Sequence, residues 1–60
     1  MKIQKIDENE KIIATYYSIG EAAKDIKINK KQTIFGVQLN IAYAILNNTK
    51  AYQYKWEIIR

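Results

Sequence analysis

The chain has 60 residues, with ten Lys or Arg against six Asp or Glu and a formal net charge of +4. It contains no Cys and no His, which excludes disulfides, thiolate metal sites and the commonest general base of hydrolytic enzymes. We expect a single domain over residues 1–60. Because a chain this short buries only about 60% of its unfolded surface, its core is marginal, and oligomerisation is a common way to add stability.

The positive charge has two interpretations, a moderately basic soluble protein or one that binds DNA or RNA. Residues 1–7 alternate charged and apolar side chains and lack the apolar run of a signal peptide. No apolar stretch approaches the ~20 residues of a membrane span. We therefore expect a cytoplasmic protein that does not bind membranes.

The N-terminal residues are typical of a β-hairpin. Lys2–Asp7 and Lys11–Tyr17 are the expected strands, and the second is rich in β-branched and aromatic residues. Glu8-Asn9-Glu10 supplies the turn, in which Asn9 is the residue best suited to a left-handed conformation.

The next segment, Ser18-Ile19-Gly20-Glu21, is a capping box that predicts the start of a helix. The apolar residues that follow have the i, i+3, i+4, i+7 spacing of one buried stripe: Ile19, Ala22, Ala23 and Ile26. Two small alanines in this stripe allow a second helix to approach closely.

A second capping box follows eleven residues later, at Asn29-Lys30-Lys31-Gln32. It predicts a turn over residues 27–29 and a helix from about Lys30 to about Leu46, ended by Asn47-Asn48. Gly36 is expected to mark a close crossing or a bend that divides this helix. A helix so apolar around its circumference is normally buried on more than one side. We therefore expect a homodimer formed through one of its stripes, Phe35, Leu39, Ala42 and Leu46.

The C-terminal residues Ala51–Ile59 alternate as a strand with Tyr52, Tyr54, Trp56 and Ile58 on one face. This face is either the core side of the strand or a platform that stacks single-stranded nucleic acid. Pairing with the hairpin predicts an α+β fold of order ββααβ. In it, a small three-stranded antiparallel sheet packs against the helix-turn-helix pair.

A helix-turn-helix places the N-terminal residues of its second helix against base edges in the DNA major groove. Here those residues are Lys30, Lys31, Gln32 and Thr33, and Lys and Gln side chains suit guanine and adenine. Lys24 and Lys27 are expected to meet flanking phosphates. The alternative is a first helical turn that is polar only because water surrounds it.

The carboxylates offer no catalytic arrangement. Asp7, Glu8 and Glu10 gather in the hairpin turn, where they are solvated charges that limit edge pairing or, alternatively, ligands of a divalent metal. We expect no enzyme, no cofactor and no metal site.

The order of these segments resembles the nuclease-associated modular DNA-binding domain, also called the intron-encoded nuclease repeat, which accompanies homing endonucleases. The matching segments are Ile3-Gln4-Lys5-Ile6-Asp7, Ser18-Ile19-Gly20-Glu21-Ala22-Ala23-Lys24, the residues Ile28 and Ile34, and Ala51-Tyr52-Gln53-Tyr54-Lys55-Trp56. The family usually has Gly where this chain has Glu10 and Lys27, and a left-handed Lys27 would be strained.

The resemblance implies binding to double-stranded DNA without catalysis. It favours a phage or mobile-element regulator or accessory factor in a bacterial or phage-infected cell. The alternative function is a protein–protein adaptor, such as a phage-encoded inhibitor of a host protein, that acts through the apolar second helix.

Overall fold

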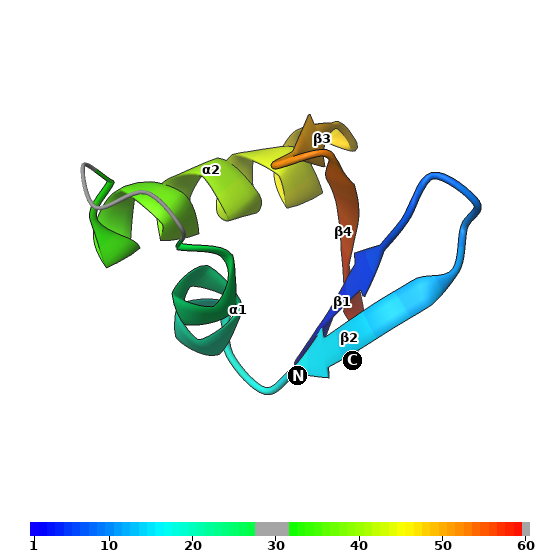
Figure 1. Cartoon of the computed structure of the whole chain (residues 1–60), viewed down its shortest axis with the longest axis horizontal. Helices are drawn as coiled ribbons and strands as arrows, with labels where there is room; N and C mark the ends of the chain where they lie inside the picture. Colours follow the sequence, from blue (N-terminus) through cyan, green and yellow to red (C-terminus); the bar gives the residue numbers. More distant parts are fainter. Residues whose placement is uncertain (28–31, 60) are drawn as a thin grey trace.

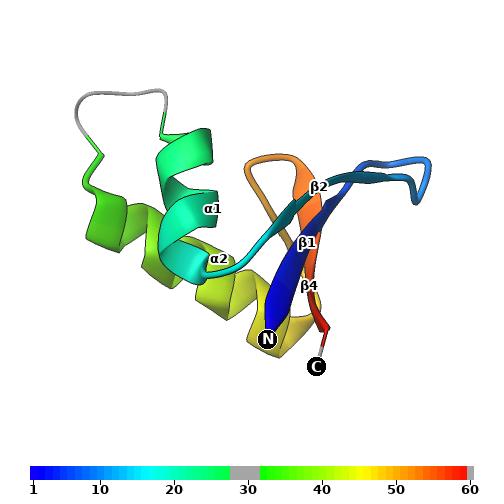
Figure 2. The same ribbon diagram turned by 90° about the horizontal axis from the view of Figure 1, so that it is seen from below.

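The computed structural model describes residues 1–27 and 32–59, and over them the chain forms an α+β fold. The elements are β1 (Lys2–Ile6), β2 (Ile12–Tyr16), α1 (Ile19–Ile26), α2 (Ile34–Asn47), β3 (Lys50–Ala51) and β4 (Tyr54–Ile59). Both helices lie on the same side of the sheet, whose other face is left open (Figures 1 and 2). No helix in the described ranges is both long and apolar enough to cross a membrane.

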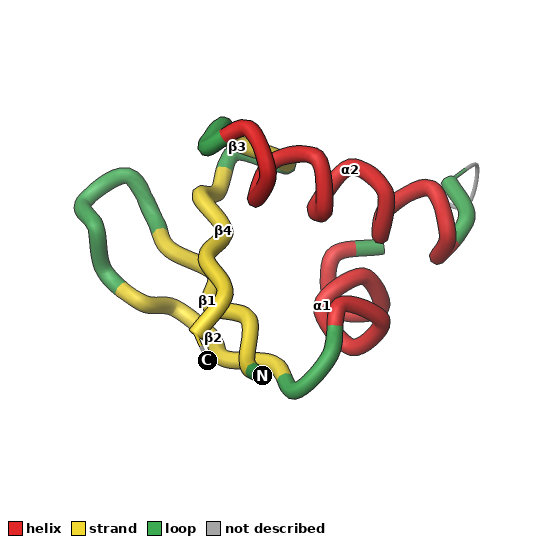
Figure 3. The backbone as a smooth tube through the Cα atoms, turned by 180° about the vertical axis from the view of Figure 1, so that it is seen from behind, coloured by secondary structure: helices red, strands yellow, loops and turns green. Residues whose placement is uncertain are grey.

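The sheet is antiparallel and has four strands in the order β2-β1-β4-β3, so the prediction of three strands was wrong. The predicted strand Ala51–Ile59 is interrupted at Tyr52 and Gln53, whose φ angles of 55° and 73° are left-handed. Two consecutive left-handed residues form the tight two-residue turn that joins neighbouring antiparallel strands. The chain therefore reverses there, and the element order is ββααββ (Figure 3).

The N-terminal hairpin is confirmed, with β1 paired to β2 and a bulge between Lys5 and Ile6. The left-handed residue of its turn is Glu10, with φ of 63°, and not Asn9 as predicted. Asp7 organises the turn, because its Oδ1 accepts hydrogen bonds from the backbone N–H groups of Asn9 and Lys11, both at 2.9 Å.

The predicted start of α1 is also confirmed. The backbone N–H of Glu21 donates to Ser18 Oγ at 3.1 Å, so Ser18 is the N-cap. Glu21 Oε1 in turn accepts from the N–H of Tyr17, one residue before the N-cap, at 3.4 Å. Helix α1 buries the predicted stripe against α2 and the sheet, with Ala22 and Ala23 fully buried.

Helix α2 begins at Ile34, four residues after the predicted start at Lys30. Thr33 is its N-cap, and the Thr33 Oγ1 accepts from the N–H of Gly36 at 2.9 Å. Asn29, Lys30 and Lys31 of the predicted capping box lie outside the described residues. The helix is continuous from Ile34 to Asn47, so of the two interpretations of Gly36 the dividing bend is excluded.

Gly36 lies instead in the first turn of α2. A Cβ at this position would stand 3.2 Å from Thr33 Oγ1. The residue therefore leaves room for the cap rather than for another helix.

The core lies between the two helices and the inner face of the sheet. Its buried members are Ile3, Tyr16, Ala22, Ala23, Ile26, Val37, Ile41, Ala44 and Trp56. Helix α2 contributes to it with Val37, Ile41 and Ala44 and leaves its other apolar stripe exposed. The indole Nε1 of Trp56 donates to the carbonyl oxygen of Ala51 at 2.9 Å, which joins β4 to β3.

Candidate nucleic-acid interface

Lys24 and Lys27 are both exposed at the C-terminal end of α1. Lys27 is the C-cap residue, and its N–H donates to the carbonyl oxygen of Ala23 at 2.9 Å. Its backbone is extended, with φ of −65° and ψ of 97°. The strain expected for a left-handed Lys27 is therefore absent, and both lysines are exposed at the end of α1.

Gln32 and Thr33 precede α2 rather than forming its first turn, so they are not placed as a recognition helix requires. The Thr33 hydroxyl already accepts the capping hydrogen bond, and Gln32 is half-buried. The first helical residues are Ile34 and Phe35, which carry no hydrogen-bonding side chain for base edges. Helix α1 ends at Ile26 and α2 begins at Ile34, and most of the predicted turn over residues 27–29 lies outside the described residues.

The acidic residue adjacent to Lys24 in the sequence is Asp25, whose side chain is 56% exposed but contacts two residues of the sheet. The Tyr16 hydroxyl donates a hydrogen bond to Asp25 Oδ2, and Lys5 Nζ lies 3.5 Å from the same oxygen. The Tyr16 hydrogen bond, helped by the Lys5 charge, lowers the pKa of Asp25 below its ordinary value. Asp25 therefore stays ionised, and its charge is balanced by Lys5 instead of by Lys24 or Lys27.

Burial raises the pKa of Tyr16 above its ordinary value of 10.0, and the hydrogen bond to Asp25 raises it further. The tyrosine thus remains protonated, and it joins β2 to α1 as a hydrogen-bond donor. The network of Lys5, Tyr16 and Asp25 orients the end of α1 on which the exposed lysines stand.

The role of Lys5 was not predicted from the sequence, although one signal was present. Lys5 follows Ile3 by two residues on β1, so it falls on the inward face of the strand. Only 9% of the residue is exposed, and its Nζ lies 4.8 Å from the centre of the Tyr54 ring. A lysine on an inward position needs such partners, because an isolated buried charge is costly.

The aromatic residues of β4 belong to the core, as one of the two interpretations predicted. Trp56 is buried, with its ring centroid 6.2 Å from that of Tyr16 and 6.5 Å from that of Tyr54. Tyr52 lies in the β3–β4 turn, where its hydroxyl accepts from Asn40 Nδ2 on α2 at 2.7 Å. These rings therefore do not form a shared stacking surface.

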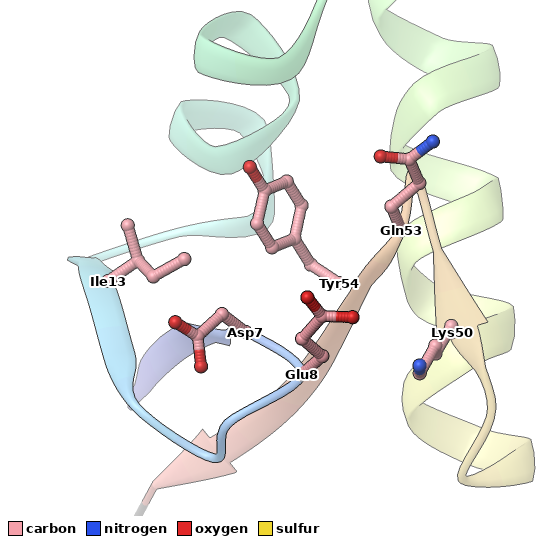
Figure 4. Close-up of a pocket in the computed structure, with 6 residues that line it drawn as sticks. All are labelled: Asp7, Glu8, Ile13, Lys50, Gln53 and Tyr54. Carbon is pink, nitrogen blue, oxygen red and sulfur yellow. The ribbon is translucent and has the colours of Figure 1, made fainter.

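The carboxylates of the N-terminal turn border an open hollow of about 510 Å³ between the two hairpins (Figure 4). Its lining residues are Asp7, Glu8, Ile13, Lys50, Gln53 and Tyr54. The Oδ1 atom of Asp7 is engaged by backbone N–H groups of the turn. Within residues 1–27 and 32–59, no group of three or more acidic residues is placed to hold a metal ion.

Comparison with models of known protein families, with curated proteins and with solved structures finds no match.

Proposed function

We propose that this protein binds double-stranded DNA without catalysis, and that Lys24 and Lys27 contact the phosphate backbone. The observation that carries the proposal is that the end of α1 exposes two positive side chains, while the negative side chain beside them is already paired. The two lysines are exposed there, while the neighbouring carboxylate of Asp25 is held by Tyr16 and Lys5. Beyond Asp25, the chain has no Asp or Glu until Glu57.

The expected mode of contact is electrostatic. Lysine acts as a point charge on phosphate, and such contacts position a protein on DNA without reading its sequence. Because α2 begins with apolar residues, we do not assign base readout to its N-terminus. The sequence-based candidates Lys30 and Lys31 lie outside the described residues and would add to the same positive segment.

The resemblance to the intron-encoded nuclease repeat supports the same proposal, since that module binds DNA. It favours a role as a regulator or accessory factor of a phage or mobile element. Its expected mode of action is binding rather than catalysis.

A second candidate function is a protein–protein adaptor that acts through α2. The observation that favours it is the exposed apolar surface of that helix, where Phe35 is 67% exposed and Leu46 is 84% exposed. An exposed apolar patch of this kind is typical of a protein-binding surface. This function and DNA binding use side chains of different helices and are separable by experiment.

The test compares two double variants by fluorescence anisotropy with a labelled DNA duplex. Lys24→Gln with Lys27→Gln is expected to weaken binding by roughly tenfold per lysine at 0.1 M salt, because each lost phosphate contact removes counterion release. Lys11→Gln with Lys50→Gln is the control, because it removes the same charge from other exposed sites. Equal weakening by the two variants would contradict a site at the end of α1.

A further inference from the structure

Helix α2 carries a stripe of four apolar residues outside the core, Phe35, Leu39, Ala42 and Leu46, which we call the α2 stripe. Three of its members are large and more than half exposed, with Leu39 at 54%, Phe35 at 67% and Leu46 at 84%. We propose that the α2 stripe binds a second copy of this chain in an antiparallel, two-fold symmetric pair. In this pair, the Phe35 ring of each copy enters an apolar hollow on the other.

The hollow is a separate feature beside the C-terminal half of α2. It measures about 280 Å³, and every residue that lines it is apolar: Met1, Ile3, Ile19, Ala42, Ile45, Leu46 and Ile58. Ala42 and Leu46 belong both to this lining and to the α2 stripe. The hollow therefore opens onto the stripe and suits an apolar side chain that arrives along the helix.

The spacing of the stripe makes it complementary to itself. Its residues are separated by four, three and four positions, a pattern that is the same in both directions. When two such helices run antiparallel, Phe35 faces Leu46 of the other copy, and Leu39 faces Ala42. A large residue thus meets a small one near the centre, and the Phe35 ring arrives beside the hollow that Leu46 borders.

The helix geometry allows both contacts to form at once. Phe35 and Leu46 lie about 16 Å apart along α2, at 1.5 Å per residue. A two-fold axis midway between them therefore brings each end of one helix against the opposite end of the other. Such an interface uses the same patch on both copies and closes at two subunits.

The absence of charged side chains on α2 is compatible with this occupant. The protein carries a net charge of +4, so two copies repel each other over most of their surfaces. Helix α2 has no charged side chain between Ile34 and Asn47. Pairing through α2 therefore avoids like-charge contact, and the antiparallel arrangement places the positive N-terminal end of one helix beside the negative C-terminal end of the other.

The experiment uses single-cysteine variants. Because the chain has no native Cys, any disulfide must join two introduced cysteines. We mix chains that carry Phe35→Cys with chains that carry Leu46→Cys under mild oxidation. A mass tag on one of the two variants distinguishes the mixed disulfide from the disulfide of either variant with itself. The expected product is a disulfide between the two variants, with little product from either variant alone. A pair of Thr15→Cys and Glu57→Cys copies, exposed positions on the sheet, gives the background from random collision.

Sedimentation equilibrium of the unmodified chain supplies the second readout, with an expected mass of twice 7.1 kDa. Leu39→Lys should give a monomer with an unchanged circular dichroism spectrum, because Leu39 lies outside the core. A monomer at all concentrations would overturn the proposal, even if α2 then bound an unrelated protein. Cross-linking of Phe35→Cys to itself, or assembly beyond two copies, would also overturn it.

Discussion

At the scale of single residues, the contact between Tyr16 and Asp25 determines which charges the end of α1 presents. Asp25 lies in the last turn of α1, where a carboxylate is unfavourable beside the negative end of the helix dipole. The hydrogen bond from Tyr16 and the charge of Lys5 offset that effect. Replacing either partner should therefore change how Asp25 titrates.

We expect Tyr16→Phe to raise the pKa of Asp25 toward its ordinary value of 3.8, because the largest cause of the lowered pKa is the Tyr16 hydrogen bond. A carboxyl group whose folded pKa is depressed stabilises the fold above its unfolded pKa and loses that contribution as pH falls through the folded pKa. The variant should thus show a smaller loss of stability below about pH 4.

Carbon-13 NMR titration of the Asp25 carboxyl group measures this change directly. Tyr17→Phe is the matched control, because Tyr17 is 70% exposed and lies in contact with Lys2 rather than Asp25. An unchanged Asp25 pKa in Tyr16→Phe would show that the hydrogen bond is not the cause.

The left-handed residue Gln53 offers a second prediction at this scale. Gln53 is exposed, and its φ of 73° is one that non-glycine residues adopt at a cost of about 1 kcal/mol. We expect Gln53→Gly to raise the free energy of unfolding by about 0.5–1 kcal/mol, because glycine has no Cβ to strain. Urea denaturation provides the measurement, and Glu57→Gly, within β4, should lower stability instead.

At the scale of elements, Thr33 sets the start of α2. Thr33→Ala should lower the free energy of unfolding by about 1 kcal/mol, because the N–H of Gly36 loses its acceptor. Chemical denaturation checks this value. Thr49→Ala is a suitable control, since Thr49 is an exposed threonine just beyond the other end of the same helix. Equal losses in the two variants would argue against the cap.

The elements that sequence predicted well are those whose signals are local. Ser18 and Glu21 surround one helix start, and the β1–β2 hairpin follows from two apolar strands with a polar turn between them. The start of α2 was harder, because Asn29 and Thr33 are both good N-cap residues and only the packed structure shows which is used. In the helix that Thr33 caps, Val37 and Ile41 face the core.

The turn at Tyr52 and Gln53 could not be predicted, because neither residue is Gly or Asn and their alternation continues into β4. Two side-chain hydrogen bonds stabilise this turn, one from α2 and one from within the hairpin. Asn40 on α2 donates to the Tyr52 hydroxyl, and Trp56 donates to the carbonyl oxygen of Ala51. Those tertiary contacts override the local preference for one continuous strand.

For the candidate site, the exposure of its lysines agrees with the sequence-based expectation, whereas the position of its other residues relative to α2 does not. Lys24 and Lys27 are exposed, as phosphate contacts require, whereas Gln32 and Thr33 precede the helix they were expected to begin. The role of Lys5 depends on three side chains that meet only after folding, so no local pattern could reveal it.

At the scale of the whole molecule, charge and apolar surface occupy different places. Lys24 and Lys27 stand exposed at the end of α1, whereas the exposed members of the α2 stripe lie on the other helix. The proposed DNA contact and the proposed pairing of two copies therefore need not compete. A pair of copies would double the number of lysines available to one duplex.

The most direct test of the DNA-binding proposal is a gel-shift titration of the unmodified chain with duplex DNA between 50 and 200 mM salt, concentrations at which phosphate contacts show a strong salt dependence. The proposal predicts binding at the low end and a linear fall of log affinity with log salt concentration, with a slope of about −0.9 for each phosphate contact. Absence of binding at 50 mM salt, or binding that salt does not weaken, would contradict it.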